Sequence, residues 1–321
     1  MEMLTGRPGR LEEPLPHGTQ MERARALPDS LKDQWLRDGY VVLPGVYSAE
    51  SVAKYNEVVK RERLTVEETK DEYGYGERIG LLHQKYPELL ELATGGRVLD
   101  LLRFAFGDEP VVFASLNFEK GTEQDAHVDA IFFCPQPAYA MAGCWVALED
   151  VHADAGPLFY VAGSHRWPFS NGEDVVVGRA ELARKREAMR QTPGGSPEEA
   201  EVVKELTITW TSDFLAMQAA QGVKQAQLLP KAGDVVIWHA LLAHGGSPRV
   251  DKSLSRRSVV FHYIGANSRL YTHEQFFLKN RHELADAPPQ TVPLADYRGL
   301  RYMKYGHYVS YKDGEAKIHL L

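Results

Sequence analysis

The sequence has little cysteine, no long apolar run and no excess of positive charge, and each shortage excludes a class of protein. Two cysteines in 321 residues, Cys134 and Cys144, exclude a disulfide framework and favour a reducing compartment. Every apolar run is shorter than the length that crosses a bilayer. A net charge of −7 disfavours binding to nucleic acid. The polar N-terminus lacks the apolar core of a secretory signal, so we expect a soluble cytoplasmic protein that binds neither membrane nor nucleic acid.

The length and the ordinary composition, with 44% hydrophobic residues, allow one large domain with a buried core. Residues 1–28 are rich in Pro, Gly and charge without apolar periodicity, which predicts a loose arm. We expect the rest, 29–321, to be a single domain. Its predicted parts are a helical N-terminal part (29–110), a β core (about 111–265), a helical insertion or lid within that core (168–230) and a C-terminal extension (266–321).

Short β-rich runs separated by turn residues fill the middle of the chain. They lie at 111–119, 127–133, 141–149, 158–162, 234–242 and 258–264. Helical patterns at 180–190 and 212–222 interrupt them. Strand after strand at close spacing predicts a mainly β protein, an antiparallel sandwich or barrel, with flanking helices.

Three residues in this β region have the chemistry of metal ligands. His127 and Asp129 are two apart in a predicted strand, so their side chains should project to one face. His244 lies far along the chain in another β-rich region. Two histidines and one carboxylate on one face of an octahedron are the facial triad of non-haem iron(II) oxygenases. A His-x-Asp pair alone is weak evidence, because it also occurs as a buried ion pair.

An arginine in the right place adds to this hypothesis. Arg256 follows His244 at the start of the next β-rich run. An oxygenase that uses 2-oxoglutarate needs a cation for the far carboxylate, and a guanidinium offers two parallel donors. Arg257 is a rival, since adjacent residues of a strand face opposite ways and only one can enter a barrel.

The order of these motifs resembles the phytanoyl-CoA dioxygenase family of Fe(II)/2-oxoglutarate oxygenases, over roughly residues 35–265. The residues that carry the resemblance are Asp38-Gly-Tyr-Val-Val-Leu-Pro44, Gln124-Asp-Ala-His127-Val-Asp129, Trp145-Val-Ala-Leu-Glu-Asp150, Gly156-Pro-Leu158, Gly163-Ser-His165, Gly233-Asp234, His239, His244-Gly-Gly-Ser247 and Arg256. The chain departs from the family pattern in an extra glycine after His244 and in Ala162, where the family has proline.

The resemblance implies a double-stranded β-helix, or jelly roll, with iron held by His127, Asp129 and His244. It implies that Arg256 binds the 5-carboxylate of 2-oxoglutarate, helped by Ser247, and that Trp145 lines the co-substrate pocket. The implied reaction uses Fe(II), 2-oxoglutarate and O2 to oxidise a C–H bond of a small molecule, with release of succinate and CO2. The carboxylate at 129 favours hydroxylation, desaturation or ring formation over halogenation.

Several further polar residues stay open between a role in the site and a structural role. Gln124 is a candidate to orient the ligands or the co-substrate. Asn117 is a candidate to hydrogen-bond the co-substrate or water, and the equally good alternative is that it lies on a half-solvated strand face. His165 fits a structural turn better than ligation, and His239 is balanced between supporting the site and packing. A basic cluster on the insertion is either solvated or the cationic face of a lid: Arg179, Arg184, Lys185, Arg186 and Arg190.

Two other functions remain open at this point. A cupin-like isomerase or small-molecule sensor would share the three ligands but would not need Arg256. A scaffold with a decayed site is disfavoured because all three ligands and the arginine are present. The long insertion favours a specialised pocket, such as one for a biosynthetic or natural-product intermediate, but no motif identifies the substrate or the oligomeric state.

Overall fold

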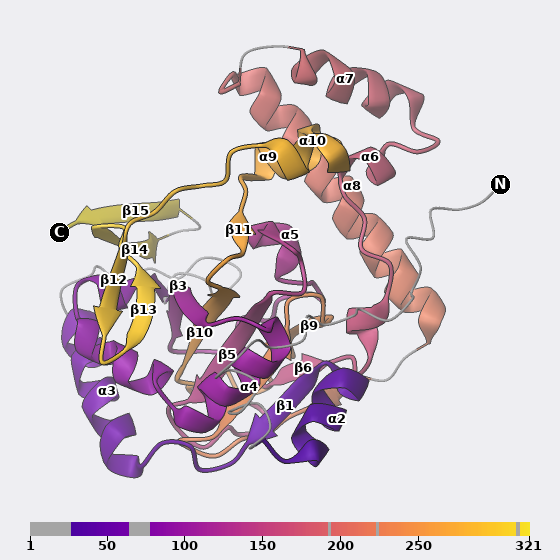
Figure 1. The fold of residues 1–321 in the computed structure, drawn as a ribbon. Helices are drawn as coiled ribbons and strands as arrows, with labels where there is room; N and C mark the ends of the chain where they lie inside the picture. Colours follow the sequence, from indigo (N-terminus) through magenta and orange to yellow (C-terminus); the bar gives the residue numbers. More distant parts are fainter. Residues whose placement is uncertain (1–26, 64–77, 192–193, 223–224, 313–314) are drawn as a thin grey trace.

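A large sheet forms the centre of the computed structural model, which describes residues 27–63, 78–191, 194–222, 225–312 and 315–321 (Figure 1). Its main path runs through β1 (Tyr40–Leu43), β8 (Val235–His239), β5 (Met141–Ala147), β10 (Ser258–Gly265), β3 (Pro110–Phe118), β2 (Ile79–Gly80), β14 (His307–Lys312) and β15 (Glu315–Leu320). Off this path, β12 (Leu294–Tyr297) pairs with β13 (Leu300–Met303), and β13 pairs with β3 in parallel. The other pairings in this sheet are antiparallel.

A small second sheet closes the barrel. It consists of β7 (Ala226–Gln227), β6 (Leu158–Tyr160) and β9 (His244–Gly246). Side chains from the inner faces of the two sheets form a shared core that includes Trp145, Trp238 and Tyr160. A separate pair, β4 (Pro135–Gln136) and β11 (Arg269–Leu270), lies outside both sheets. The predicted jelly roll is confirmed.

The central strands are buried on both faces, which explains their continuous apolar sequences. In β8, Val235 and Ile237 pack outward against the helical layer, while Val236 and Trp238 point into the barrel. This alternation follows from the two-residue period of a strand.

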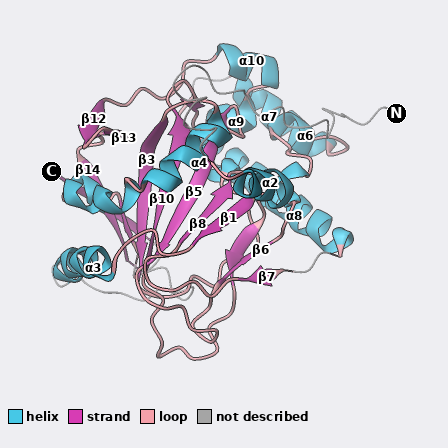
Figure 2. Ribbon diagram, turned by 60° about the horizontal axis from the view of Figure 1, so that its bottom comes forward, coloured by secondary structure: helices cyan, strands magenta, loops and turns pink. Residues whose placement is uncertain are grey.

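Helices cover the outer face of the large sheet, with α2 and α4 lying across its strands in Figure 2. This layer contains α2 (Asp29–Asp38), α3 (Ala49–Arg63), α4 (Gly96–Phe106) and the 3₁₀ helices η2 (Leu82–Gln84) and η3 (Pro87–Ala93). In α4, Val98, Leu101, Leu102 and Ala105 are buried at the spacing of one helix face. Gly107 ends the helix in the left-handed conformation that glycine adopts without strain.

A second group of helices lies at one end of the barrel, above it in Figure 1. It contains α6 (Gly172–Val175), α7 (Ala180–Arg190), α8 (Pro197–Gln221), α9 (His273–Leu278) and α10 (Arg281–Asp286), and the turn η4 (Ser164–Arg166) leads into it. These helices share an apolar core of their own. None of the helices in the described part of the chain is long and apolar enough to cross a membrane.

The helix predicted from the sequence at 212–222 is the C-terminal part of α8, which begins earlier. The helix begins after the N-cap Ser196 rather than near 212. Its middle is rich in threonine, which has weak helix propensity. The hydroxyls of Thr207, Thr209 and Thr211 each donate to the carbonyl four residues earlier, so these polar groups are satisfied within the helix.

The predicted strand at 127–133 is wrong. His127 forms only an isolated bridge with His244, and the chain then turns into the short helix α5 (Ala130–Phe133). Asp129 already has helical backbone angles, and the amide of Ala130 donates to the carbonyl of Ala240 instead of to a strand partner. The pattern was misleading because a short apolar run has no periodicity that separates a strand from a buried helical turn. The predicted loose arm lies almost wholly outside the described residues, which begin at 27.

Candidate metal centre

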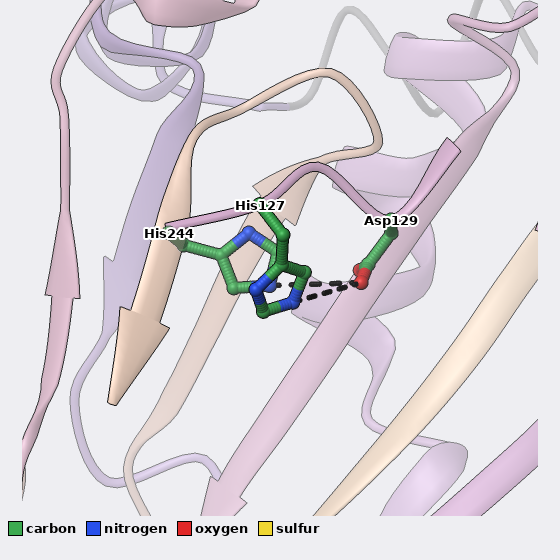
Figure 3. Close-up of side chains that lie close together, drawn as sticks. All are labelled: His127, Asp129 and His244. Atoms are coloured by element: carbon green, nitrogen blue, oxygen red, sulfur yellow. Dashed lines mark ion pairs between the residues drawn. The ribbon is translucent and has the colours of Figure 1, made fainter. Parts of the chain in front are cut away.

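His127, Asp129 and His244 converge at one point inside the barrel (Figure 3). Asp129 Oδ1 lies 3.9 Å from Nε2 of His127 and 3.6 Å from Nε2 of His244. One nitrogen or oxygen atom from each residue lies within 4.8 Å of the other two. A single ion between them could therefore bind all three.

The backbone sets the orientation of both imidazoles. His127 and His244 exchange two backbone hydrogen bonds, of 2.9 and 3.0 Å, so their rings lie side by side with centroids 4.4 Å apart. Each Nδ1 is 2.9 Å from the carbonyl oxygen two residues earlier, that of Asp125 or Leu242. A carbonyl only accepts, so Nδ1 carries the proton and the lone pair of each Nε2 faces the convergence point.

The charge states suit a divalent cation. Burial lowers the pKa of His127 to about 4, with a further contribution from His244, so the ring is neutral at pH 7 and able to bind a metal. Burial by itself would raise the pKa of Asp129, but the imidazoles of His244 and His262 outweigh it and hold this pKa well below its usual value. Two neutral nitrogens and one anionic oxygen are the donor set that non-haem iron(II) prefers.

A cavity of about 310 Å³ opens in front of these ligands and reaches Arg256. Arg256 lies just before β10, is 1% exposed, and donates to the carbonyl of Gly156 at 3.0 Å. Burial lowers its pKa to about 10, so the guanidinium stays charged at neutral pH. Arg257 does not line the cavity: its side chain is 43% exposed and pairs with Glu149 at 2.7 Å. The geometry therefore gives Arg256, and not Arg257, access to a ligand.

Three buried donor atoms around this end of the barrel have no hydrogen-bond partner among the described residues. They are Nε of Arg256, Nε1 of Trp145 and the hydroxyl of Tyr160. The guanidinium carbon of Arg256 is 5.8 Å from the ring of Trp145. Burial raises the pKa of the Tyr160 hydroxyl, which the charge of Arg256 partly offsets, but Tyr160 does not line the cavity. Buried donors without partners cost free energy, so their clustering favours a ligand rich in acceptor oxygens.

The other residues predicted to bind the co-substrate divide into two groups. Gln124 lines the cavity, as Trp145 does. Ser247 does not line it: Ser247 is buried, and its hydroxyl accepts a hydrogen bond of 2.8 Å from Nε2 of Gln227. Asn117 also lies outside the cavity lining. Its amide oxygen accepts from the hydroxyl of Tyr55, and its amide nitrogen donates to the carbonyl of Ile79. The strand face of Asn117 is turned to the helical layer.

The two remaining candidate histidines lie away from the cavity lining. The rings of His165 and His239 are 5.3 Å apart, and His239 also packs 5.7 Å from Trp35. Burial lowers the pKa of His239 to about 3 and that of His165 to about 4. Both are neutral core residues at pH 7.

Basic side chains of the insertion form ion pairs and hydrogen bonds with residues of the helical group itself. Arg179 pairs with Asp213, Lys185 with Glu205, and Arg190 with Glu187 and Glu283. Arg186 donates to the backbone carbonyls of Phe277 and Lys279. None of these cations lines the metal cavity. The idea of a cationic lid therefore has no support in the geometry.

Sequence reasoning missed several residues that line the cavity, among them two from central strands and two from distant parts of the chain. Trp238 and His262 come from β8 and β10, and strand alternation from Val236 and Val260 could have placed both inside the barrel. Arg78 and Tyr311 come from distant parts of the chain, with the guanidinium carbon 4.6 Å from the tyrosine ring. No local signal marks them, since β2 and β14 meet only through long-range pairing.

The fold and this geometry define a class: a jelly-roll protein with two histidines and one carboxylate gathered in a cavity. The family model described as Phytanoyl-CoA dioxygenase (PhyH) matches residues 35–258, most of the chain, and the chain belongs to that family. The resemblance drawn from the sequence motifs is confirmed.

Two groups of proteins are distantly similar to this chain in sequence. The chain is 25% identical over 200 residues to phytanoyl-CoA dioxygenase domain-containing protein 1 of Danio rerio, covering 61% of this chain and 59% of that protein. It is 29% identical over 147 residues to the ectoine dioxygenase of Sphingopyxis alaskensis, covering 40% of this chain and 47% of that protein. The matches thus span about half the length of these relatives.

Solved structures support the fold. The non-haem α-ketoglutarate-dependent epimerase SnoN from nogalamycin biosynthesis superposes with a TM-score of 0.57 at 22% identity, covering 86% of this chain and 97% of that one. The iron-bound EctD of S. alaskensis superposes with a TM-score of 0.55 at 20% identity, covering 78% of this chain and 83% of that one.

Proposed function

We propose that this protein is an Fe(II)- and 2-oxoglutarate-dependent oxygenase that hydroxylates an unactivated C–H bond of a small molecule. One observation carries the proposal: the three potential ligands and the buried Arg256 face the same cavity. Family membership supports it, as do solved structures of similar fold, SnoN with Fe3+ and α-ketoglutarate and EctD with 2-oxoglutarate.

His127, Asp129 and His244 would hold the metal. Both imidazoles are turned with Nε2 toward Asp129 Oδ1, and the carboxylate neutralises one of the two positive charges. When bound, iron(II) with 2-oxoglutarate supplies dioxygen activation, with succinate and CO2 as co-products. The protein's part is to orient the reactants at a site set between the two sheets.

Arg256 would anchor the far carboxylate of 2-oxoglutarate. The guanidinium is fixed by the carbonyl of Gly156 and keeps Nε for a ligand. Trp145 Nε1, which lines the cavity and also has no partner among the described residues, is a candidate to complete the set of donors.

The substrate would enter on the other side of the metal ligands. Phe132 is 45% exposed and meets the ring of His127 at 5.4 Å, and Phe133 and Leu116 extend the apolar wall. These walls suit a small molecule with an apolar part. Desaturation and ring formation use the same arrangement and remain alternatives to hydroxylation.

The test is iron binding and succinate release by wild type and His127→Ala. The variant should lose nearly all turnover and bind iron far more weakly, because one of three protein ligands is gone. His152→Ala is the matched control, since His152 is an exposed histidine outside the cavity. Equal iron content and equal turnover in wild type and His127→Ala would refute the proposal.

A cupin-like metal protein without oxygenase activity is the alternative. Such a protein would not need a buried arginine beside the cavity, whereas Arg256 is 1% exposed and its Nε has no partner among the described residues. Wild-type protein that binds iron but shows no change in its spectrum with 2-oxoglutarate would favour it.

A further inference from the structure

The two oxygens of Asp129 have different surroundings. Oδ1 faces Nε2 of His127 and Nε2 of His244, at 3.9 and 3.6 Å. Oδ2 accepts a hydrogen bond of 2.7 Å from Nε1 of Trp238 and lies 3.5 Å from Nε2 of His262. One oxygen is thus turned to the metal ligands, and the other is held by the protein.

The chemistry of these groups fixes the direction of each interaction. An ionised carboxylate only accepts, and an indole nitrogen only donates. The Nε2 of His262 must therefore carry a proton to interact favourably with Oδ2. Nδ1 of His262 has no hydrogen-bond partner among the described residues, so nothing in the protein competes for that tautomer.

Gly143 makes room for the indole. It pairs with Trp238 across β5 and β8, and the indole occupies the space that a side chain at position 143 would take. A Cβ at position 143 would lie 2.8 Å from Nε1 of Trp238 and closer still to Cε2. Any larger residue would therefore displace the atom that holds Oδ2.

We propose that Trp238, seated on Gly143, and His262 restrict Asp129 to binding the metal through one oxygen. The inference rests on the proposed function. A facial triad leaves three positions of an octahedron open only if each ligand binds through a single atom. If Oδ2 also bound the ion, one position needed for 2-oxoglutarate or dioxygen would be lost. Trp238 and His262 are positioning residues in this account.

A purely structural role makes a different prediction. The indole of Trp238 also packs 4.8 Å from the ring of His244 and 5.8 Å from that of Tyr160. If packing were its whole contribution, Trp238→Phe would lower the stability of the fold without changing how Asp129 binds a metal. Metal affinity and coordination number separate the two roles.

The experiment titrates metal-free protein with cobalt(II) in the absence of 2-oxoglutarate. The visible absorption of cobalt(II) reports the number of ligands around it. Trp238→Phe should weaken cobalt binding about 10–100-fold, the range for removing a group that orients a metal ligand, and should change the visible band. Gly143→Ala should reproduce both effects although Trp238 and Asp129 are retained.

Trp210→Phe is the matched control. Trp210 is also buried and donates Nε1 to the carbonyl of Ser170 at 3.0 Å, but it belongs to the helical group. Its substitution removes the same kind of hydrogen bond and should leave the cobalt titration unchanged. At position 262, His262→Leu should weaken binding, and His262→Gln, which keeps a donor, should restore part of the affinity.

The outcomes distinguish the inference from the function beneath it. Wild-type protein that binds neither cobalt nor iron would defeat the proposed function. Wild-type protein that binds the metal, with equal affinity and spectrum in Trp238→Phe and Gly143→Ala, would overturn only the inference. Circular dichroism shows whether each variant folds, and the His262 pair decides the matter if the other two do not.

Discussion

Arg256 and Arg257 are neighbours in the sequence with opposite surroundings. Arg256 is buried beside the cavity, and Arg257 is bound to Glu149 at the surface. We expect Arg256→Lys to raise the KM for 2-oxoglutarate roughly 10–100-fold, because an ammonium cannot form the two parallel hydrogen bonds of a guanidinium. Metal affinity without 2-oxoglutarate should stay the same. Succinate release at varied 2-oxoglutarate concentration measures the effect.

Arg257→Lys serves as the control for that change. It makes the same substitution one residue away, on the outer side of the barrel. We expect its KM for 2-oxoglutarate to equal that of wild type. If Arg257→Lys raised this KM and Arg256→Lys did not, the assignment of the two arginines would be reversed.

At the scale of elements, Gly172 allows α6 to pack against α9. A Cβ there would lie 2.7 Å from Cα of Phe277 and closer still to its carbonyl. We expect Gly172→Ala to lower the free energy of unfolding by about 1–3 kcal/mol or more, since backbone must move to relieve the overlap. Urea denaturation measures the loss. Gly96→Ala, at an exposed helical site with nothing within 4 Å, should be neutral or slightly stabilising.

A buried carboxylate joins the C-terminal strands to the helical layer. Glu62 is 0% exposed and accepts hydrogen bonds from Tyr308 at 2.6 Å, Lys85 at 2.8 Å and Tyr86 at 2.9 Å. Tyr308→Phe removes one of these charge-assisted bonds and should cost about 1.5–3 kcal/mol in urea denaturation. Tyr308 lies on β14, so losing its bond to Glu62 should also increase hydrogen exchange in that strand. The same strand carries Tyr311, which lines the cavity. Unchanged stability would show that this link is not needed.

At the scale of the whole molecule, buried histidines couple stability to pH. Burial lowers the pKa of His83 and His239 to about 3 and that of His165 to about 4, from about 6.5 in an unfolded chain. Below pH 6.5 the unfolded chain binds protons that the folded protein does not. Stability is therefore complete above pH 6.5 and is lost as the pH falls toward 4.

These three groups should lower the free energy of unfolding of metal-free protein by roughly 4 kcal/mol between pH 7.5 and 5.5. Urea denaturation at the two pH values measures this difference. His239→Gln removes one of these contributions and should reduce the pH-dependent loss by about 1.4 kcal/mol. A loss of the same size in wild type and His239→Gln would contradict the account.

The sequence by itself determined the central strands, the family and the three candidate ligands. The central strands are continuous apolar runs because both of their faces are covered, and such runs are visible without a structure. The ligands belong to ordered local motifs, His127 with Asp129 and then His244 before Arg256. A motif of this kind is a property of neighbouring residues, so sequence reasoning could reach it.

Only the tertiary structure decided what surrounds those ligands. Trp238 and His262 reach Oδ2 of Asp129 from two strands, and a glycine on a third, Gly143, makes room for the indole. Tyr311 enters the cavity from the far end of the chain. The turn of the backbone at Asp129 was also hidden, because it depends on a hydrogen bond to Ala240. Contacts between residues distant in sequence leave no local pattern, so they are set by how the sheets close around the site.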